Sequence, residues 1–189
     1  EDMNLTCDTI KFYSKDDQLL SIGSSHVWDN DYDLVADTIT VFTNIDSGIA
    51  SGNVTLVQKG QVINANRIEY KKDKSQDGLS YRAIGNVIIK DSSRVATCGL
   101  ARYDRENEIT ILELEPEIKE NNRLLAGTKI TLGYEQERLK NLHIPKNAYA
   151  ITPIRGYQAS SIDSNQVGDS LRFNDKMEGT SLSGFFENG

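Results

Sequence analysis

The chain has 189 residues, of which 38% are hydrophobic and 26% charged, with a formal net charge of −7. This composition is typical of a globular protein that forms one sizeable domain or a short array of repeats. The acidic excess argues against general nucleic-acid binding, because neutralising phosphates requires clustered Lys and Arg. No run of about 18 apolar residues occurs, so the sequence predicts no membrane-spanning helix.

A short motif recurs along the chain: a small residue, then a polar pair, then an apolar residue. Successive copies of the small residue are 29, 29, 33, 28 and 33 residues apart. A glycine at Gly23, Gly52 and Gly85 keeps the same spacings of 29 and 33, so we interpret both anchors as parts of one repeat. The copies TCDTI, VADTI, NANRI, TCGLA, LAGTKI and QASSI place the small residue at Cys7, Ala36, Ala65, Cys98, Ala126 and Ala159.

Apolar and polar residues alternate within each repeat, which predicts β-strands with one buried face. In chain order, the alternation runs through 39–41, then 54–58, 62–70 and 87–89. Residues 109–119 and 139–146 keep the strand pattern but lack the glycine. No segment has the pattern of an amphipathic helix, so we expect a nearly all-β protein. Turn sequences separate the expected strands at 29–31, 59–60, 73–78, 104–107 and 121–122.

A single unit of this kind cannot bury its apolar face alone, whereas stacked units share a continuous core. We therefore expect an elongated structure with two walls and a long interior. The small residue of each unit is expected where the walls approach closely or where a strand turns a corner. The glycine of the second anchor is expected to have a positive φ or to lie in a β-bulge.

Two segments, ADTITVF…ASGNVTLVQKG and NANRIEYKK…AIGNVIIKD, resemble the OstA-like family, which includes LptA, LptC and the periplasmic part of LptD. The resemblance is clearest over residues 5–92 and weaker over 93–165. It implies an all-β fold: an elongated, twisted β-jellyroll of stacked antiparallel strand repeats, with two opposed sheets and an apolar groove between them. We expect residues 1–165 to form these repeats, and residues 166–189 to begin a further β segment that continues beyond the last residue.

The resemblance also implies a function. OstA-like proteins carry lipopolysaccharide across the periplasm of Gram-negative cells, so we expect a periplasmic protein, alone or associated with the outer membrane. Its partners would be lipopolysaccharide or a related glycolipid, and other Lpt-type jellyrolls or a second copy joined by edge-strand addition. The family has no known catalytic residues, which implies that the chain is not an enzyme. No nucleotide-binding motif such as a P-loop occurs, so the energy for transport must come from elsewhere.

Several apolar positions are candidates for lining a lipid groove. Exposing an acyl chain to water is unfavourable by about 0.8 kcal/mol per CH₂, so a lipid in transit needs a continuous apolar shelter. The same side chains could instead fill a closed core, in which case the chain would be a non-catalytic structural β-repeat scaffold without a lipid ligand. A β-helix-like lyase or hydrolase would need Asp, Arg or Lys clustered on one face, which the repeat does not supply. The groove candidates are Ile39, Val41, Val54, Leu56, Ala65, Ile68, Val87 and Ile89.

The residues that most often carry chemistry have structural interpretations here. Neither His26 nor His143 has a Cys or carboxylate at metal-ligand spacing, so we expect surface histidines, and neither a metal nor a cofactor. Asp8 and Asp37 share one repeat position, where a role in a turn or bulge is favoured over acid–base catalysis.

The cysteines and the first aromatic residues also have structural interpretations. Cys7 and Cys98 stand three repeats apart where other copies have Ala, so we expect two free thiols. Trp28 and Tyr32 flank an acidic turn and are expected to cap the core of the first unit rather than meet a partner. Arg155, Arg172 and Lys176 are candidate contacts for lipid phosphates on charge alone.

Overall fold

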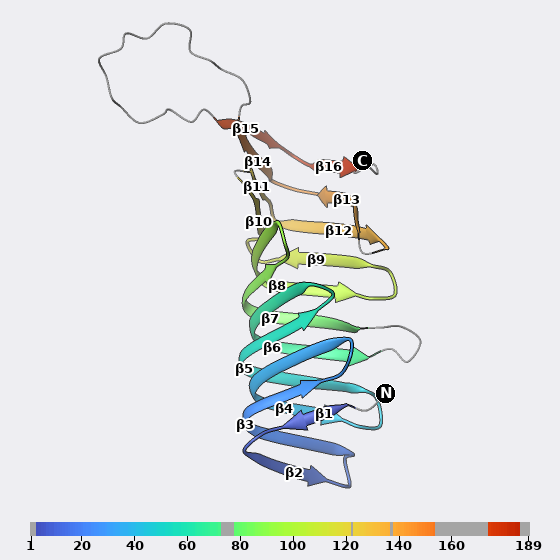
Figure 1. Cartoon of the computed structure of the whole chain (residues 1–189). Coiled ribbons are helices and arrows are strands. Elements are labelled where there is room, and N and C mark those ends of the chain that lie inside the picture. Colours follow the sequence, from blue (N-terminus) through green and yellow to red (C-terminus); the bar gives the residue numbers. More distant parts are fainter. Residues whose placement is uncertain (1–2, 73–77, 122, 137, 154–173, 186–189) are drawn as a thin grey trace, which may run out of the picture.

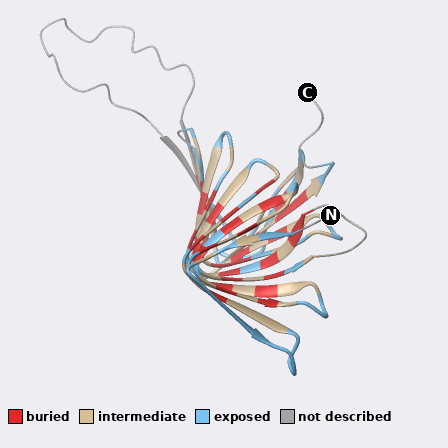
Figure 2. Cartoon of the chain, turned by 60° about the horizontal axis from the view of Figure 1, so that its bottom comes forward, coloured by how far each residue is buried: buried red, intermediate tan, exposed pale blue. Residues whose placement is uncertain are grey.

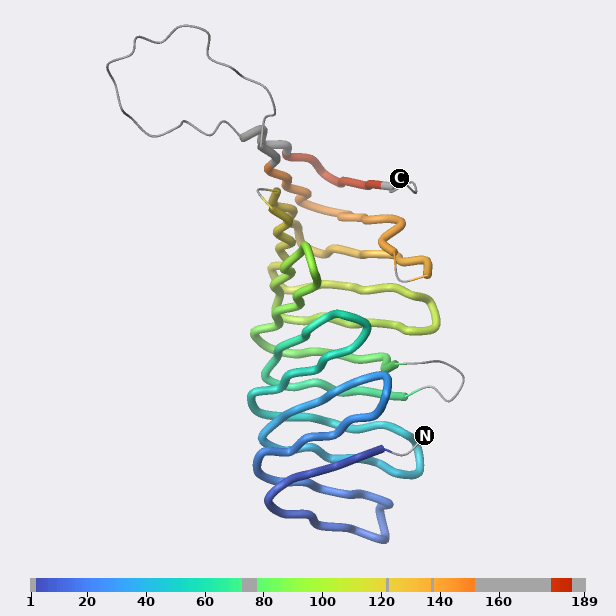
Figure 3. The backbone as a smooth tube through the Cα atoms, viewed as in Figure 1, coloured from blue at the N-terminus to red at the C-terminus, as the bar shows by residue number. Residues whose placement is uncertain are grey.

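The computed structural model describes residues 3–72, 78–121, 123–136, 138–153 and 174–185 (Figure 1). Within these residues the chain forms 16 strands joined in one antiparallel sheet, which confirms the all-β prediction. The chain winds back and forth while it advances from the β2 end to the β16 end, so the molecule is elongated (Figure 3). None of the residues placed here forms a helix with the length and hydrophobicity needed to traverse a bilayer.

The strands fall into two groups by length. The first group contains the six longest strands, β3 to β8, preceded by two short edge strands. In order these are β1 (Asn4–Thr6), β2 (Thr9–Tyr13), β3 (Gln18–Trp28), β4 (Tyr32–Phe42), β5 (Ser47–Gln58), β6 (Gln61–Lys72), β7 (Leu79–Lys90) and β8 (Arg94–Asp104). The second group is β9 (Ile109–Glu113), β10 (Glu117–Glu120), β11 (Arg123–Ala126), β12 (Lys129–Glu135), β13 (Arg138–Ile144), β14 (Ala148–Pro153), β15 (Asn174–Gly179) and β16 (Leu182–Phe185).

Each strand from β3 to β8 bends near its middle, where the pairing register with its neighbours shifts. The bends line up as a spine, and the sheet folds along it into two walls that diverge as a V (Figure 2). Wall A contains β2, residues 18–22, 38–42, 47–51, 67–72, 79–84 and 100–104, and then β9, β12, β13 and β16. Wall B contains β1, residues 25–28, 32–36, 54–58, 61–65, 87–90 and 94–98, and then β10, β11, β14 and β15.

The glycines of the second anchor lie at the spine, as predicted. Gly52 and Asn53 have φ of 78° and 47°, the left-handed conformation that glycine and asparagine adopt most readily. A Cβ on Gly52 would lie 2.2 Å from Oδ2 of Asp37, and Nδ2 of Asn53 donates a hydrogen bond of 3.0 Å to the same oxygen. Asp37 therefore covers a corner of the sheet, which confirms its predicted structural role. The same corner recurs at Gly23 and Gly85.

The small residues of the first anchor also lie at the spine. Ala36, Ala65 and Cys98 are 3%, 7% and 8% exposed and directly precede the register shift or the end of their wall segment. A small side chain is needed here because the two walls meet at this line. The prediction that these positions mark corners is confirmed.

Beyond β8 the strands no longer pass through the spine. Between β9 and β10 the chain turns at Leu114 and Glu115, with φ of 62° and 59°, and between β13 and β14 it turns at Asn147, with φ of 50°. Each strand from β9 to β14 thus belongs to one wall only. The two opposed sheets of the expected jellyroll are the two walls of one folded sheet, continuous across the spine in the first group and divided in the second.

Both walls turn an apolar face into the V. On wall A, cross-strand neighbours form the series Ile39, Ala50, Ile68, Ala83, Ala101, Leu112 and Ile130. On wall B they form the series Val27, Leu34, Leu56, Ile63, Ile89, Ala96, Ile118 and Leu125. The two series belong to one hydrophobic cluster, so the core runs along the spine for most of the described length.

At the far end, β15 pairs with β14 and β16 pairs with β13, so both walls continue through these strands. The predicted boundary at residue 165 lies outside the described residues and stays a prediction, as does the expected repeat copy at Ala159. The expected turn at 73–78 also falls largely outside them.

Candidate functional site

The interior between the walls is the candidate site, and the predicted groove residues all lie there. Their side chains point into the V from both walls and belong to the hydrophobic cluster. Each is at most 9% exposed, so these side chains are packed together in this structure rather than lining an open channel. Wall A contributes Ile39, Val41 and Ile68, and wall B contributes Val54, Leu56, Ala65, Val87 and Ile89.

Farther from the spine, the inner faces become aromatic and polar. Five of the eight tyrosines of the chain lie here, among Gln58, Gln61 and Thr110. The rings of Tyr81 and Tyr103 are 5.6 Å apart on neighbouring strands. The rings of Tyr32 and Tyr70 are 6.5 Å apart across the two walls. We call this band the tyrosine rim; its tyrosines are Tyr32, Tyr70, Tyr81, Tyr103 and Tyr134.

The rim is rich in hydrogen-bonding groups, and four of its phenols have raised pKa values. Burial raises the pKa of Tyr32 to about 12, with Asp29 and Asp31 adding to the shift, and burial likewise raises the pKa of Tyr70, Tyr81 and Tyr134. The hydroxyl of Tyr70 is buried without a hydrogen-bond partner. The site therefore pairs an apolar floor at the spine with a neutral polar band near the mouth.

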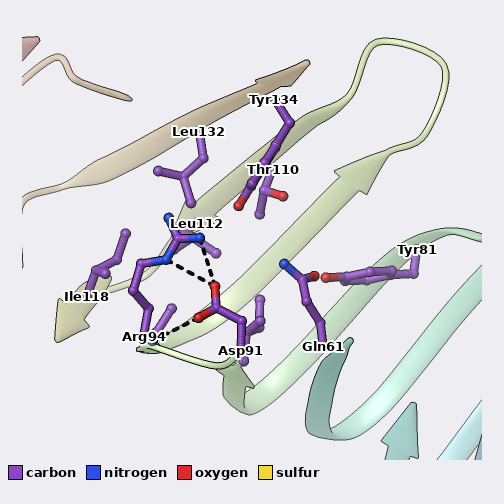
Figure 4. A pocket seen from close by; sticks show the side chains of 11 residues that line it. Gln61, Tyr81, Asp91, Arg94, Thr110, Leu112, Ile118, Leu132 and Tyr134 are labelled. Carbon is purple, nitrogen blue, oxygen red and sulfur yellow. Dashed lines mark hydrogen bonds and ion pairs between the residues drawn. The ribbon is translucent and has the colours of Figure 1, made fainter. Parts of the chain in front are cut away.

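Two small cavities lie under the rim. One, of about 30 Å³, is bounded by Tyr81, Leu112 and Leu132 of wall A and by Ile89, Ala96 and Ile118 of wall B (Figure 4). The other, of about 40 Å³, lies beside Gln58, Tyr103 and Tyr134. Spaces of this size hold about one water molecule each. A chain of methylene groups would enter only if the walls moved apart.

An ion pair borders the first cavity on wall B (Figure 4). Nη2 of Arg94 lies 2.8 Å from Oδ2 of Asp91, and the backbone N–H groups of Ser93 and Arg94 donate to the other carboxylate oxygen. Burial by itself raises the pKa of Asp91, but these hydrogen bonds and the Arg94 charge outweigh it and hold the pKa below its usual value. The pair closes the turn between β7 and β8, and the Asp91 carboxylate neutralises the charge of Arg94.

The two walls also touch through polar groups at the mouth of the V. Nζ of Lys72, at the end of β6 in wall A, lies 2.5 Å from Oδ2 of Asp29 and 3.7 Å from Oδ2 of Asp31, which follow β3 in wall B. The side-chain amide of Gln58, in wall B, makes two hydrogen bonds with the backbone of Leu79 in wall A, of 3.0 and 3.2 Å. These contacts hold the mouth closed over the first group of strands.

Apolar surface is accessible at the two ends of the interior. At the β2 end, Ile10 and Phe12 pair with Ser21 and Leu19 and are 55% and 61% exposed. At the other end, Leu125, Leu139 and Leu182 are only partly buried against the core. The described interior thus begins at exposed apolar side chains of β2 and extends to partly buried ones in β11, β13 and β16.

The remaining candidates lie away from the interior. On the outer face of wall B, Nε2 of His26 is 3.0 Å from Oδ2 of Asp33, and its ring stacks on Trp28 at 4.3 Å. Tyr32 caps the core as predicted, whereas Trp28 lies outside it. His143 bonds Ser183 at 2.8 Å. Within the described part of the chain no three His, Cys, Asp or Glu side chains gather as a metal site.

Both cysteines carry free thiols, and burial raises the pKa of Cys98 to about 11, so its thiol stays protonated.

Two of the three cationic candidates, Arg155 and Arg172, lie outside the described residues, as does the side chain of Lys176.

Sequence reasoning missed the tyrosine rim and the contacts across the mouth. Tyr70, Tyr81 and Tyr103 are cross-strand neighbours, so a strand register drawn from the repeat would have placed them in one row. Asp29 and Lys72 are 43 residues apart in the chain, and no periodic signal connects them.

The folded antiparallel sheet, with its two walls and the long apolar interior between them, is a β-jellyroll. The chain belongs to the LptA/LptD N-terminal domain family of LPS transport proteins, whose model matches residues 33–138, and members of this family are not enzymes. Among solved structures it is similar to LptH of Pseudomonas aeruginosa, the LptA-homologous periplasmic component of a lipopolysaccharide transport device. That likeness covers 94% of each chain at 12% identity, with a TM-score of 0.33. No curated protein matches the sequence significantly.

Proposed function

We propose that this transport protein binds lipopolysaccharide, or a related glycolipid, between its two walls and passes it along as one segment of a periplasmic bridge to the outer membrane. The observation that carries the proposal is the uninterrupted pair of inward apolar series, which runs from β4 to β12 on wall A and from β3 to β11 on wall B. Such a series offers an acyl chain contact with apolar side chains along its whole length.

The chemistry of the interior suits an amphiphile. Acyl chains would lie on the apolar floor near the spine, where each buried CH₂ contributes about 0.8 kcal/mol. The tyrosine rim and the amides of Gln58 and Gln61 would face the ester, amide and hydroxyl groups at which the chains join the polar head. Neutral donors and acceptors at this depth avoid burying an unpaired charge.

Binding requires the walls to separate, because the interior is filled in the structure described here. The free energy gained by burying acyl chains must exceed the loss of packing between the walls, and the bends at the spine are where the angle of the V would change. The filled interior equally favours the second candidate function, a non-catalytic scaffold without a lipid ligand, so the test must distinguish a core that opens from one that does not.

The ends of the sheet suit edge-strand addition. β2 presents an unpaired edge with Ile10 and Phe12 exposed beside it, and β15 and β16 are the last described strands of the two walls. An exposed edge with apolar neighbours readily accepts a further strand. Another Lpt-type jellyroll, or a second copy of this chain, would continue the interior across such a joint.

Site-specific photo-crosslinking to lipopolysaccharide tests the proposal. A photoreactive residue replaces Val54, Leu56, Val87 or Ile89, one at a time, and outward-facing Thr55 and Lys90 serve as controls on the same strands. We expect lipid adducts at the inward sites only. If circular dichroism shows that the variants are folded and no site forms adducts, the scaffold function replaces the transport function.

A further inference from the structure

The contact between Lys72 and Asp29 joins the two walls at the open side of the V, far from the spine. Lys72 ends the wall A part of β6, and Asp29 directly follows the wall B part of β3. Nζ of Lys72 also lies 5.8 Å from the centre of the Tyr32 ring, the first tyrosine of the rim. One side chain of wall A thus holds both a carboxylate and an aromatic ring of wall B.

The partner of Lys72 is rigidly placed. The side chain of Asp29 is 3% exposed, and its Oδ1 accepts hydrogen bonds from the N–H groups of Asp31 and Tyr32 at 2.8 and 3.1 Å. These bonds fix the turn between β3 and β4 and direct Oδ2 toward Lys72. Removing Lys72 would leave a buried carboxylate without its counter-charge, which is strongly unfavourable while the mouth stays closed.

A second contact reinforces the first. Gln58 is 3% exposed, and its amide both donates to the carbonyl and accepts from the N–H of Leu79. Gln58 adjoins Tyr32 across the pairing of β4 and β5, as Leu79 adjoins Lys72 across the pairing of β6 and β7. The two contacts therefore form one continuous closure, which we call the mouth latch: Asp29, Lys72, Gln58 and the backbone of Leu79.

We propose that the mouth latch controls lateral access to the interior: the walls open over β3 to β7 only when Lys72 separates from Asp29 and Gln58 separates from Leu79. This inference rests on the proposed function for its ligand but not for its geometry. A lipid that enters from the side must first break the latch, whereas one that arrives through an end of the stack meets the open apolar surface there.

Cys98 provides a built-in reporter of opening. It lies at the spine in the wall B part of β8, beside Val87 of the latched strand β7, and is 8% exposed, so parting of the walls over the neighbouring strands should make it more accessible to a maleimide. Cys7 is replaced by Ala, the residue of the equivalent position in other repeats, to leave one thiol. When opening is fast relative to labelling, the labelling rate is proportional to the open fraction.

Four variants are compared in the C7A background: Lys72→Met, Asp29→Asn, the double variant, and Lys71→Met as the control. Asn at 29 keeps an oxygen that can accept the turn hydrogen bonds, and Lys71 is an exposed neighbour of equal charge on the opposite face of β6. We expect Lys72→Met and Asp29→Asn each to speed labelling by about tenfold, and the double variant to add little, because both changes break one contact. Lys71→Met should label like the parent protein.

Local opening must be distinguished from unfolding of the whole chain. The labelling rate is therefore measured at several low urea concentrations, where an opening that exposes little surface responds weakly to denaturant. A weak urea dependence together with faster labelling supports the latch. Equal rates in Lys72→Met and Lys71→Met, or acceleration that follows global unfolding in urea, would overturn it.

Lipid loading separates this inference from the proposed function. With a photoreactive residue at Leu56, Lys72→Met and Asp29→Asn should each form lipopolysaccharide adducts faster than Lys71→Met. If adducts form at the same rate in all variants, the latch does not control lipid access, and the proposed transport function is unaffected. No adducts in any variant would contradict the transport function, while the thiol-labelling rates would still decide whether the latch exists.

Discussion

The strands β3 to β8 and the strands β9 to β14 build the same V in two different ways. The first group crosses the spine without interruption, and at Gly23, Gly52 and Gly85 the corner is a residue pair with positive φ. The second group stops at the spine and resumes as a new strand in the other wall. The V therefore forms with or without the glycine anchor, and in β3, β5 and β7 the anchor sits where one strand continues from one wall into the other.

The difference has a mechanical consequence. In the first group, each strand from β3 to β8 joins wall A to wall B through its own backbone, and the mouth latch joins the walls again at the opposite side. In the second group, the two walls are joined only by the short segments between successive strands. We therefore expect the walls to separate more readily over β9 to β14, and this difference can be tested by changing residues in each group.

The largest loss of stability is expected from adding a Cβ at a glycine of the spine. Gly52→Ala should destabilise the fold by about 3 kcal/mol, because the new Cβ combines left-handed strain with a collision against the Asp37 carboxylate. Gly60, with φ of 72° and no atom within 4 Å of its would-be Cβ, is the matched control. Gly60→Ala should cost only about 1 kcal/mol. Equal losses in urea unfolding would show that conformation alone, and not the covered corner, matters at the spine.

The next largest loss of stability is expected from shortening a side chain at the apolar floor of the interior. Leu56→Ala should destabilise by about 3 kcal/mol, because Leu56 is fully buried between the walls and its loss leaves a cavity. Leu125→Ala, in the second group, removes a partly buried side chain of the same wall and should cost about 1 kcal/mol. Calorimetry of both variants measures the difference. A loss at Leu125 as large as that at Leu56 would mean that the two groups are equally closed.

Acid should weaken the first group selectively. Burial by itself raises the pKa of Asp29, but hydrogen bonds from Lys72, Asp31 and Tyr32 outweigh it, so its pKa in the folded protein lies below 3.8. A carboxyl group with a lowered folded pKa contributes stability that is fully present above pH 3.8 and is lost as the pH falls through the folded pKa. Unfolding free energies measured from about pH 6 to about pH 2.5 should fall less steeply at the acid end in Asp29→Asn than in the parent protein. Parallel curves for the two proteins would refute this contribution.

The smallest expected change is a gain in stability rather than a loss. Leu114 turns the chain between β9 and β10 with φ of 62° and is 63% exposed, so it bears left-handed strain with little burial in return. Leu114→Gly should stabilise the protein by about 1 kcal/mol. Leu114→Ala keeps the Cβ and therefore the strain, and it should bring no gain. If both variants behave alike in urea, strain at this corner is negligible.

Most of the fold could be predicted from the repeat, because the alternation and the anchors of each unit depend only on residues close together in the sequence. Period-two alternation placed all eight groove candidates on the inner face, and the paired anchors placed Ala36 and Gly52 at corners. The division of the second group into separate strands was not foreseen, although the missing glycine was its signal. The mouth latch could not be read from the sequence, because it depends on how far wall A is offset along wall B, which is set by the twist of the whole sheet.

The most direct test of lipid binding between the walls uses two adjacent leucines of β11. Leu125 faces the interior, opposite Ile118 and Ala150, while Leu124 faces outward beside Lys119 and Ile151. A photoreactive residue is placed at each position in turn, in the presence of lipopolysaccharide. We expect adducts at position 125 and none at position 124. Equal adducts at both positions, or adducts at 124 alone, would contradict an interior lipid path.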